Sequence, residues 1–382
     1  MTDSQQELAR IIRGEINENG GWVSFSEFMR QALYAPGLGY YEQAQVFGEA
    51  GDFITGGEMG PWLALGFSDL IEWGWQQLGC PQHWTLLEQG GGSGRLLCDV
   101  AKNLRERALP FPELVAVEAS SNMRARQEEV YRNAEIEVSI HIGLDELAAI
   151  PNCLMICNEL PDAFPVRCFC YRDGSIYERG VSCDDERFIW RDSDVPLTDG
   201  PEIDADLIRE WPGGYISEWN PGLESWQQQA AAVIGNGYLF CVDYGYTRQE
   251  YYRPQRIEGS LLGHIGHQTT TDVLTNPGSM DLTAHIDFTA LCQYGLRYDL
   301  KATCLMPQGL WLAQSPSVQA AVQQYALAGK EDDIKMLAHA KRMMLPFGMG
   351  EIFKLLIQAK GVEEAMPPYL AQLASANKFN LL

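Results

Sequence analysis

The hydrophobic positions of the chain change their spacing near residue 84. Before this point they follow the period of an α-helix. In VSFSEFMRQALY (23–34) the residues on one helical face are Phe25, Phe28, Met29, Ala32 and Leu33. Ser24 and Glu27 have the spacing of a capping box, and Pro36 predicts the end of this helix. With a second helix, rich in Trp and Leu, over about 61–78, the pattern predicts a helical N-terminal part.

From Trp84 onward, short apolar runs alternate with amphipathic segments. The runs that predict strands are 84–88, 114–118, 137–142, 153–157 and 238–244. Helices between the early runs are typical of a doubly wound, mostly parallel sheet. After Pro165 the segment 166–192 has short strands separated by turn residues, which predicts an inserted antiparallel β segment. Apolar runs at 297–306 and 351–359 predict an antiparallel edge.

The composition is that of a folded, acidic protein. Of the 382 residues 46% are hydrophobic, 10 are Trp, and the formal net charge is −23. Because an acidic surface repels polyanions, we expect no nucleic-acid partner and no binding to an anionic membrane surface. The charge is compatible with a cationic partner, although an acidic balance often does no more than keep a protein soluble.

The cysteines and the start of the chain predict a cytoplasmic location. Ten cysteines are scattered without a paired framework, as in CLMIC (153–157), which is typical of buried, reduced thiols. The sequence has no apolar run of about 18 residues, so we expect no membrane insertion. MTDSQQELARIIRGEI at the start has no apolar signal core, and neither a secretion signal nor a transit peptide is expected.

The glycine-rich stretch EQGGGSG (88–94) lies between a predicted strand and a predicted helix, the position of a ligand-binding βα turn. A dinucleotide fingerprint needs a third glycine where the chain has Arg95, and the lysine of a Walker A loop is missing. Bare backbone at Gly90, Gly92 and Gly94 lets a bulky ligand approach. A helix beginning near Ser93 offers free N–H groups to a carboxylate.

Two acids frame this turn. Glu118 ends the next predicted strand, thirty residues after Glu88, and its carboxylate can accept hydrogen bonds from both hydroxyls of a ribose. Glu88, before the glycines, can engage an ammonium group. An ammonium group, a carboxylate and a ribose together describe S-adenosylmethionine. The alternative is a tight structural turn with an incidental acid.

Several blocks of the sequence resemble one family, the S-adenosylmethionine-dependent methyltransferases related to the mitochondrial complex I assembly arginine methyltransferase and its bacterial homologues. The blocks are FMRQALYAPGLGYYEQAQVFGEAGDFITGGE, EQGGGSG, NELPDAFPVRCF, VDYGY, EGSLLGHIGHQTTTDVLTNPGSMDLTAHIDFTAL and FGMGEIFKLLIQAKG. The sequence departs from the family at Gly91 and at Gly56-Gly57, where prolines are usual, and at GSLLGH (259–264), where G-T-L-x-x-Y is common. The first two departures make the backbone near the expected cofactor more flexible. The third lies nearer the expected substrate, so the substrate can differ from the family's best-known one.

The resemblance implies a class I methyltransferase fold, with a Rossmann-like doubly wound sheet, an N-terminal helical cap and an inserted β-rich segment. We predict a cap over 1–80 that contributes to the cofactor site, and a methyltransferase domain over 81–382. Within that domain we expect a β-rich, substrate-binding insertion at about 165–218 and a cleft loop at about 246–285.

The resemblance also assigns residues to the cofactor. Gly51, Asp52, Phe53 and Thr55 in GDFIT would close over the methionine end of S-adenosylmethionine, although GDFIT alone is equally an ordinary turn with a buried Phe. The predicted cofactor-binding set is Gly51, Asp52, Phe53, Thr55, Glu88, Gly90, Gly92, Ser93, Gly94, Glu118 and Asn158. His264 and His267 have no third ligand nearby in the sequence, so we predict no metal.

The candidate catalytic residues follow two of the predicted strands. Asn158, Glu159 and Asp162 come after CLMIC, and Asp243 ends the strand 238–244. In a doubly wound sheet these strand ends face the ligand crevice. A protonated guanidinium needs a carboxylate that matches its fork, for which Glu159 is the first candidate and Asp162 the second. As an alternative, Asn158 is the N-cap of a helix with acids in its first turn.

The predicted activity is methyl transfer from S-adenosylmethionine to an arginine side chain of a protein, with a homodimer as a possible assembly. The rival activities are a small-molecule methyltransferase and a cofactor-binding assembly factor with little turnover. A nicotinamide dehydrogenase is disfavoured by Arg95. His285 could form a wall of the site, although a lone histidine is more often structural.

Overall fold

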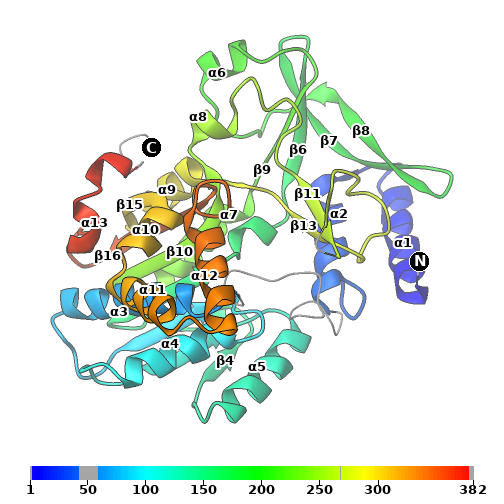
Figure 1. The fold of residues 1–382 in the computed structure, drawn as a ribbon. Coiled ribbons are helices and arrows are strands. Elements are labelled where there is room, and N and C mark those ends of the chain that lie inside the picture. The colour runs from blue at the N-terminus through cyan, green and yellow to red at the C-terminus, as the bar shows by residue number, and fades with distance from the viewer. Residues whose placement is uncertain (1, 43–58, 267, 378–382) are drawn as a thin grey trace.

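The computed structural model describes residues 2–42, 59–266 and 268–377 (Figure 1). The described residues form a central eight-stranded sheet, ordered β15-β16-β10-β5-β2-β3-β4, with β14 (Ile286–Asp287) paired to the end of β10. The other strands of this sheet are β2 (Thr85–Gln89), β3 (Glu113–Val117), β4 (Ser139–His141), β5 (Cys153–Asn158), β10 (Gly237–Tyr246), β15 (Lys301–Pro307) and β16 (Phe353–Lys360).

The sheet has the predicted direction pattern. The strands from β4 to β10 are parallel, and β16 runs antiparallel to both β10 and β15. The chain first builds β2, β3 and β4 toward one side, then returns to place β5 on the other side of β2. Strand order therefore reverses between β2 and β5, and ligands of such sheets bind outside the carboxyl ends of the strands at this point. The predicted doubly wound sheet with an antiparallel edge is confirmed.

Helices cover both faces of the sheet, so nearly every position of β2, β5, β10 and β16 is buried. Leu154 and Ile156 of β5 pack in one core, while Met155 packs in the core on the opposite face. The first core contains α3 (Trp62–Gln77), α4 (Arg95–Arg105), α10 (Gln308–Gln314), α11 (Pro316–Ala328) and α12 (Glu331–Met344). The second contains α7 (Gly222–Val233) and α9 (Phe288–Arg297). Although α3 lies in the range predicted as a cap, it packs against α4, β5 and β10.

The β-rich segment predicted after Pro165 forms a second sheet. Its path is β1-β7-β6-β9, with β8 on the outer side of β7. The strands are β1 (Val23–Ser24), β6 (Arg167–Arg172), β7 (Ser175–Asp184), β8 (Arg187–Pro196) and β9 (Tyr215–Trp219). Two N-terminal helices, α1 (Asp3–Glu18) and α2 (Phe25–Tyr34), pack against this sheet around a separate apolar core (Figure 1).

The two N-terminal helices have different start signals. Ser24 caps α2 by accepting a hydrogen bond from the Glu27 backbone at 3.2 Å. The Glu27 carboxylate binds Arg30 instead of returning to the cap, so only half of the predicted capping box forms. Helix α1, which was not predicted, has a complete capping box between Thr2 and Gln5.

A small third sheet belongs to the segment predicted as a cleft loop. It consists of β11 (Leu262–Ile265), β12 (Gln268–Thr270) and β13 (Asp281–Thr283). Strand β13 contacts α2 and the short helix η4 (Pro161–Ala163) that follows β5. The Ala284 backbone donates to the Asp162 carbonyl at 3.2 Å. A segment distant in sequence is thereby fixed beside the end of β5.

Across the described ranges, no helix has both the length and the apolar composition needed to cross a membrane. All ten cysteines are free thiols, most of them buried, as expected from their scattered positions.

Candidate active site

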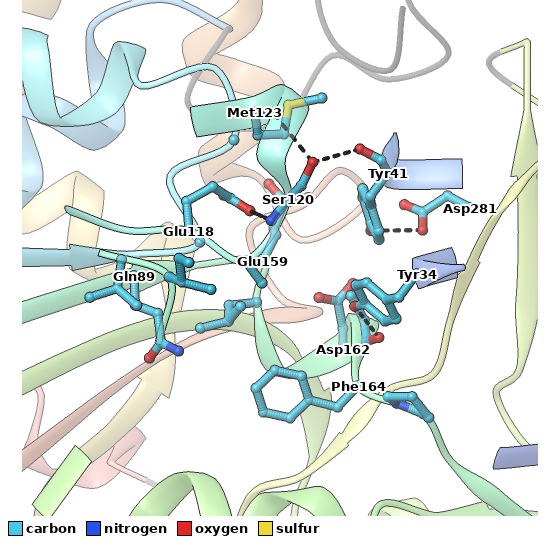
Figure 2. Close-up of a pocket in the computed structure, with 18 residues that line it drawn as sticks. Tyr34, Tyr41, Gln89, Glu118, Ser120, Met123, Glu159, Asp162, Phe164 and Asp281 are labelled. Atoms are coloured by element: carbon cyan, nitrogen blue, oxygen red, sulfur yellow. Dashed lines mark hydrogen bonds between the residues drawn. The ribbon is translucent and has the colours of Figure 1, made fainter. Parts of the chain in front are cut away.

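A cavity of about 280 Å³ lies at the carboxyl ends of β2, β3 and β5 (Figure 2). It occupies the point where strand order reverses. Its described lining is Tyr34, Tyr41, Gln89, Gly90, Gly92, Val117, Glu118, Ala119, Ser120, Met123, Ile142, Glu159, Leu160, Asp162, Ala163, Phe164, Pro165 and Asp281. Five of the residues predicted from the sequence are in this lining: Gly90, Gly92, Glu118, Glu159 and Asp162.

The glycine turn forms one wall of the cavity. Gly90 and Gly92 have φ angles of 70° and 51°, in the left-handed region that favours glycine. A Cβ on Gly90 would lie only 2.7 Å from Leu160 Cδ1, so a side chain there would also displace the next wall. Gly94 ends the turn as the N-cap of α4, one residue beyond the predicted helix start at Ser93. Ser93 and Gly94 are not among the described residues that line the cavity.

Glu88 lies behind the turn, outside the described lining. Its side chain is buried, and burial together with the charge of Glu118 raises its pKa to about 8, against a hydrogen bond from the Leu97 backbone in the first turn of α4. A Cβ on Gly91 would clash with Glu88 Oε2 in its present position. The predicted contact of Glu88 with an ammonium group stays a prediction.

Glu118 faces the cavity from the end of β3. One carboxylate oxygen accepts a hydrogen bond from the Ser120 backbone at 2.9 Å (Figure 2). Burial raises the pKa of Glu118 to about 7, opposed by backbone hydrogen bonds and by the charge of Arg124. The apolar side chains of Met123 and Ile142 line the same side. A carboxylate beside an apolar wall suits a ribose hydroxyl pair next to a flat heterocycle.

The opposite end of the cavity is acidic. Glu159 follows β5 with a φ angle of 50°, an uncommon conformation for a non-glycine residue. Its backbone donates to the Val242 carbonyl at 2.9 Å, which fixes this turn to β10. Asp162, on η4, is only 4% exposed, and burial raises its pKa to about 7 although it accepts a hydrogen bond from Tyr244.

Asn158 and Asp243, predicted as catalytic, are not among the described residues that line the cavity. Asn158 donates to Glu159 Oε1 at 3.1 Å. Asp243 is fully buried and accepts a hydrogen bond from the Asp162 backbone at 3.2 Å. Burial and the charge of Asp162 raise the pKa of Asp243 well above its usual value. Both side chains are therefore placed to orient the two acids that face the cavity.

Thirteen of the 18 described lining residues were not predicted from the sequence, among them Tyr34, Tyr41 and Asp281. Tyr34 ends α2 and donates to the Ala163 carbonyl at 2.8 Å. Tyr41 lies on the short helix η1 (Tyr40–Glu42) and donates to Asp281 Oδ1 at 2.8 Å. Asp281 comes from β13, 240 residues away from Tyr41. No local pattern reveals a pair so distant; the only signal was that all three residues lie in the blocks that resemble the family.

The remaining predicted positions fall elsewhere. Gly51, Asp52, Phe53, Thr55 and His267 lie outside the described residues. The His285 ring packs against the rings of Tyr244 and Tyr246, with ring centroids 5.2 Å apart in each pair. Burial lowers the pKa of His285 to about 3. Within 2–42, 59–266 and 268–377, no group of three His, Cys, Asp or Glu side chains is arranged to hold a metal ion.

Comparisons with known proteins agree with this geometry. The sequence model of a family described as "Putative S-adenosyl-L-methionine-dependent methyltransferase" matches residues 70–305, from α3 to β15. The chain belongs to this family. Its match covers the glycine turn, Glu118, Glu159 and Asp281.

Relatives of this methyltransferase cover nearly the whole chain. The mitochondrial protein arginine methyltransferase NDUFAF7 homologue of Drosophila melanogaster is 25% identical over 403 residues, with 93% of this chain and 85% of that protein covered. The protein arginine methyltransferase NDUFAF7 of Bos taurus is 25% identical, with 88% and 80% covered. A crystal structure from Burkholderia thailandensis, bound to S-adenosyl-homocysteine, superposes with a TM-score of 0.88 at 26% identity, covering 99% of this chain and 97% of that one.

The methyltransferase depends on S-adenosylmethionine, and the residues present fit this cofactor. Gly90 and Gly92 leave room at the turn, Glu118 presents a carboxylate, and Ile142 supplies an apolar surface in one cavity. When bound, the cofactor supplies a methyl group on a positively charged sulfur. The acidic walls suit that charge, since opposite charges in a partly desolvated site attract strongly.

Replacing Glu118 by alanine is expected to weaken S-adenosyl-homocysteine binding by about 1.5–3 kcal/mol, the range for losing hydrogen bonds to a charged group. Titration calorimetry measures this change. Glu113→Ala is the matched control, because Glu113 is exposed at the other end of β3. Unchanged affinity in a folded Glu118→Ala protein would remove Glu118 from the cofactor site.

Cofactor affinity is also expected to depend on pH. Only the ionised Glu118 carboxylate accepts both ribose hydroxyls, and its pKa is raised to about 7. The ionised fraction grows as pH rises through this value, so S-adenosyl-homocysteine should bind about tenfold more tightly at pH 8 than at pH 6. Glu118→Gln should bind more weakly and with a flatter pH profile. A profile that is identical in wild type and Glu118→Gln would contradict this assignment.

Proposed function

We propose that this methyltransferase methylates arginine side chains of a protein substrate. The observation that carries the proposal is the acidic end of the cavity, where Glu159, Asp162 and Asp281 converge without a Lys, Arg or His among the described lining residues. Three carboxylates facing one cavity repel one another. A cationic acceptor relieves this repulsion, whereas a neutral or anionic acceptor does not.

The guanidinium group of arginine suits these acids by shape as well as charge. It stays protonated at any ordinary pH, and its planar fork pairs with a carboxylate through two parallel hydrogen bonds. In our proposal Glu159 makes this pair, because it lies directly after β5 and Asn158 holds one of its oxygens at 3.1 Å. Asp162 offers a second carboxylate. Its Oδ1 has no hydrogen-bond partner among the described residues.

The role of the chain in this proposal is mainly to hold the acceptor. Fixing one nitrogen of the guanidinium beside the methyl group converts a bimolecular step into an effectively unimolecular one, which is faster. Carboxylates already held in place by Asn158, Asp243 and Tyr244 need no reorganisation, and one of them would take the proton that the guanidinium loses as its nitrogen gains the methyl group, so that the product again carries a single positive charge. Tyr34 and Tyr41 supply the N-terminal wall that keeps water out. This wall supports the predicted contribution of the cap to the site.

The names of the relatives support the arginine acceptor. Both are called protein arginine methyltransferases, at 25% identity over most of this chain. The departure in GSLLGH gives no separate support to a small-molecule acceptor. Ser260, in that stretch, is buried and its backbone donates to Glu218 Oε1 at 2.9 Å, away from the described cavity lining.

The proposed function is tested by transfer of labelled methyl groups. A lysate from cells that lack the protein is incubated with purified wild-type protein and methyl-labelled S-adenosylmethionine, then separated into protein and small-molecule fractions. We expect the label in the protein fraction. Label confined to small molecules would contradict a protein acceptor, and no transfer at all would favour an assembly factor with little turnover.

A further inference from the structure

We propose that Asp281 is a further acceptor-binding carboxylate beside Glu159 and Asp162, held in place by Tyr41, and that it selects a cationic acceptor over a neutral one of the same shape. This inference rests on the proposed function. It adds a specificity-determining residue from the cleft loop and a positioning residue from the N-terminal part of the chain.

The first support is the position of Asp281. It lies on β13, is only 8% exposed, and still belongs to the cavity lining together with Glu159 and Asp162. Glu159 and Asp162 lie in the segment that follows β5 of the central sheet. Asp281 belongs to β13 of the small third sheet and approaches the cavity from the opposite side. Figure 2 shows Asp281 beside Tyr41, across the cavity from Glu118. A group between these walls would therefore meet carboxylates from two directions.

The second support is a polar atom that lacks a partner. Asp162 is 4% exposed and lines the same cavity, and its Oδ1 accepts no hydrogen bond from the described residues. A buried acceptor left without a donor costs about 1–3 kcal/mol, more for a charged group. The five N–H donors of a guanidinium can serve Asp162, Glu159 and Asp281 together, which a hydroxyl with its single donor cannot do.

The charges around Asp281 also support a cationic acceptor. Burial and the charges of Asp162 and Glu159 raise the pKa of Asp281 well above its usual value, against a hydrogen bond from Tyr41. A cation placed between Asp281 and Asp162 favours the ionised form of both carboxyl groups. A neutral acceptor would leave the two acids to repel each other or to take up a proton. Charge on the acceptor is thus recognised directly.

Tyr41 fixes Asp281 relative to the cofactor wall. Its hydroxyl donates to Asp281 Oδ1 at 2.8 Å, and its carbonyl accepts from Ser120 Oγ at 2.8 Å. The Ser120 backbone in turn donates to Glu118 at 2.9 Å. The ring of Tyr34 stacks on Tyr41 with centroids 5.4 Å apart. This connection sets the distance between the ribose-binding acid and Asp281, so Tyr41 acts as a positioning residue.

The test uses two small probes that differ in charge but hardly in shape, butylguanidinium and butylurea. Their binding to the complex of the protein with S-adenosyl-homocysteine is measured by titration followed by NMR. We expect wild type to bind butylguanidinium in preference to butylurea. Asp281→Asn should lose about tenfold or more of the affinity for butylguanidinium, as for a lost hydrogen bond to a charged group. Its affinity for S-adenosyl-homocysteine should be unchanged.

Matched variants separate this role from a structural one. Asp272→Asn, an exposed acid in the same loop, should behave as wild type. Asp281→Glu keeps the charge and should retain the preference for butylguanidinium. Tyr41→Phe should lower the affinity for butylguanidinium by less than Asp281→Asn does. The substitution removes the hydrogen bond that holds the Asp281 carboxylate but leaves the carboxylate itself in place. Each variant is first shown to bind S-adenosyl-homocysteine, which reports an intact fold.

The outcomes distinguish this inference from the proposed function. If wild type prefers butylguanidinium and Asp281→Asn binds it equally well, the role of Asp281 is overturned while an arginine acceptor stands. If wild type shows no preference for butylguanidinium over butylurea, the proposed selection of a cationic acceptor by Asp281 is contradicted. The arginine acceptor then also loses its main support. Loss of the preference in Asp281→Asn and its retention in Asp281→Glu would establish Asp281 as the specificity residue.

Discussion

Replacing Glu159 by glutamine is expected to lower the rate of methyl transfer by about a hundredfold or more, the order seen when one preorganised electrostatic contact is lost. Glutamine keeps the size of the side chain and part of its hydrogen bonding but removes the charge. Glu159 faces the same cavity as Asp162, and its negative charge contributes to the raised pKa of the Asp162 carboxyl group. Cofactor affinity should be unchanged while turnover falls.

The matched control is Asp185→Asn. Asp185 also has a left-handed backbone, with a φ angle of 51°, but it is exposed in the turn between β7 and β8. The two substitutions make the same chemical change in the same backbone conformation, so a general effect of that conformation would appear in both. The assay is transfer of labelled methyl groups to a protein pool, with S-adenosyl-homocysteine affinity measured in parallel. Full activity in Glu159→Gln would exclude Glu159 as the guanidinium partner.

A valine at Gly92 is expected to abolish cofactor binding. Gly92 has a φ angle of 51° and lines the cavity, so the side chain would fill space that the ligand needs. A β-branched residue is also strained in this conformation by about 1–3 kcal/mol. Together these effects should lower the affinity for S-adenosyl-homocysteine by about a hundredfold or more. Titration calorimetry on the folded variant measures the loss.

Gly213→Val is the control for this substitution. Gly213 is exposed, and a Cβ there would meet no atom within 4 Å. It should bind S-adenosyl-homocysteine as wild type does. Normal affinity in Gly92→Val would show that the glycine turn does not contact the cofactor, and thermal unfolding of both variants shows whether any loss reflects the fold.

The inner strands β5 and β10 of the central sheet were predictable because both of their faces are buried. Continuous apolar runs such as 153–157 and 238–244 leave few alternatives to a buried strand. Helices were harder to predict. The segment 3–18 carries only four buried residues among many polar ones, and α1 was not predicted. The hairpin of α11 and α12 has only three buried residues, Val318, Ala340 and Met343, and it was missed as well.

The candidate site was predictable where its residues follow strand ends. Glu118 and Glu159 come directly after β3 and β5, and their positions at the cavity follow from the topology of the sheet. The sequence alone did not show that Glu88 and Asp243, which lie inside their strands, have side chains behind the cavity wall. Strand alternation sets these directions, and it depends on the register of each strand.

The other wall of the site could not be predicted from local patterns. Tyr41 and Asp281 are joined by a hydrogen bond across 240 residues of sequence. They meet because η1 packs on α2 while β13 contacts both α2 and η4, and that packing is a property of the whole fold. The family resemblance marked both segments without indicating that their side chains contact each other.

The central claim, that the methyl acceptor is arginine, is tested most directly by identifying the methylated amino acid. The protein fraction labelled by wild type is hydrolysed completely, and the labelled residue is identified by chromatography against methylated standards. We predict that the label elutes as a methylated arginine and that it is reduced by about a hundredfold in the Glu159→Gln reaction. Label that elutes as methyl-lysine, or that is released as a methyl ester, would contradict the account.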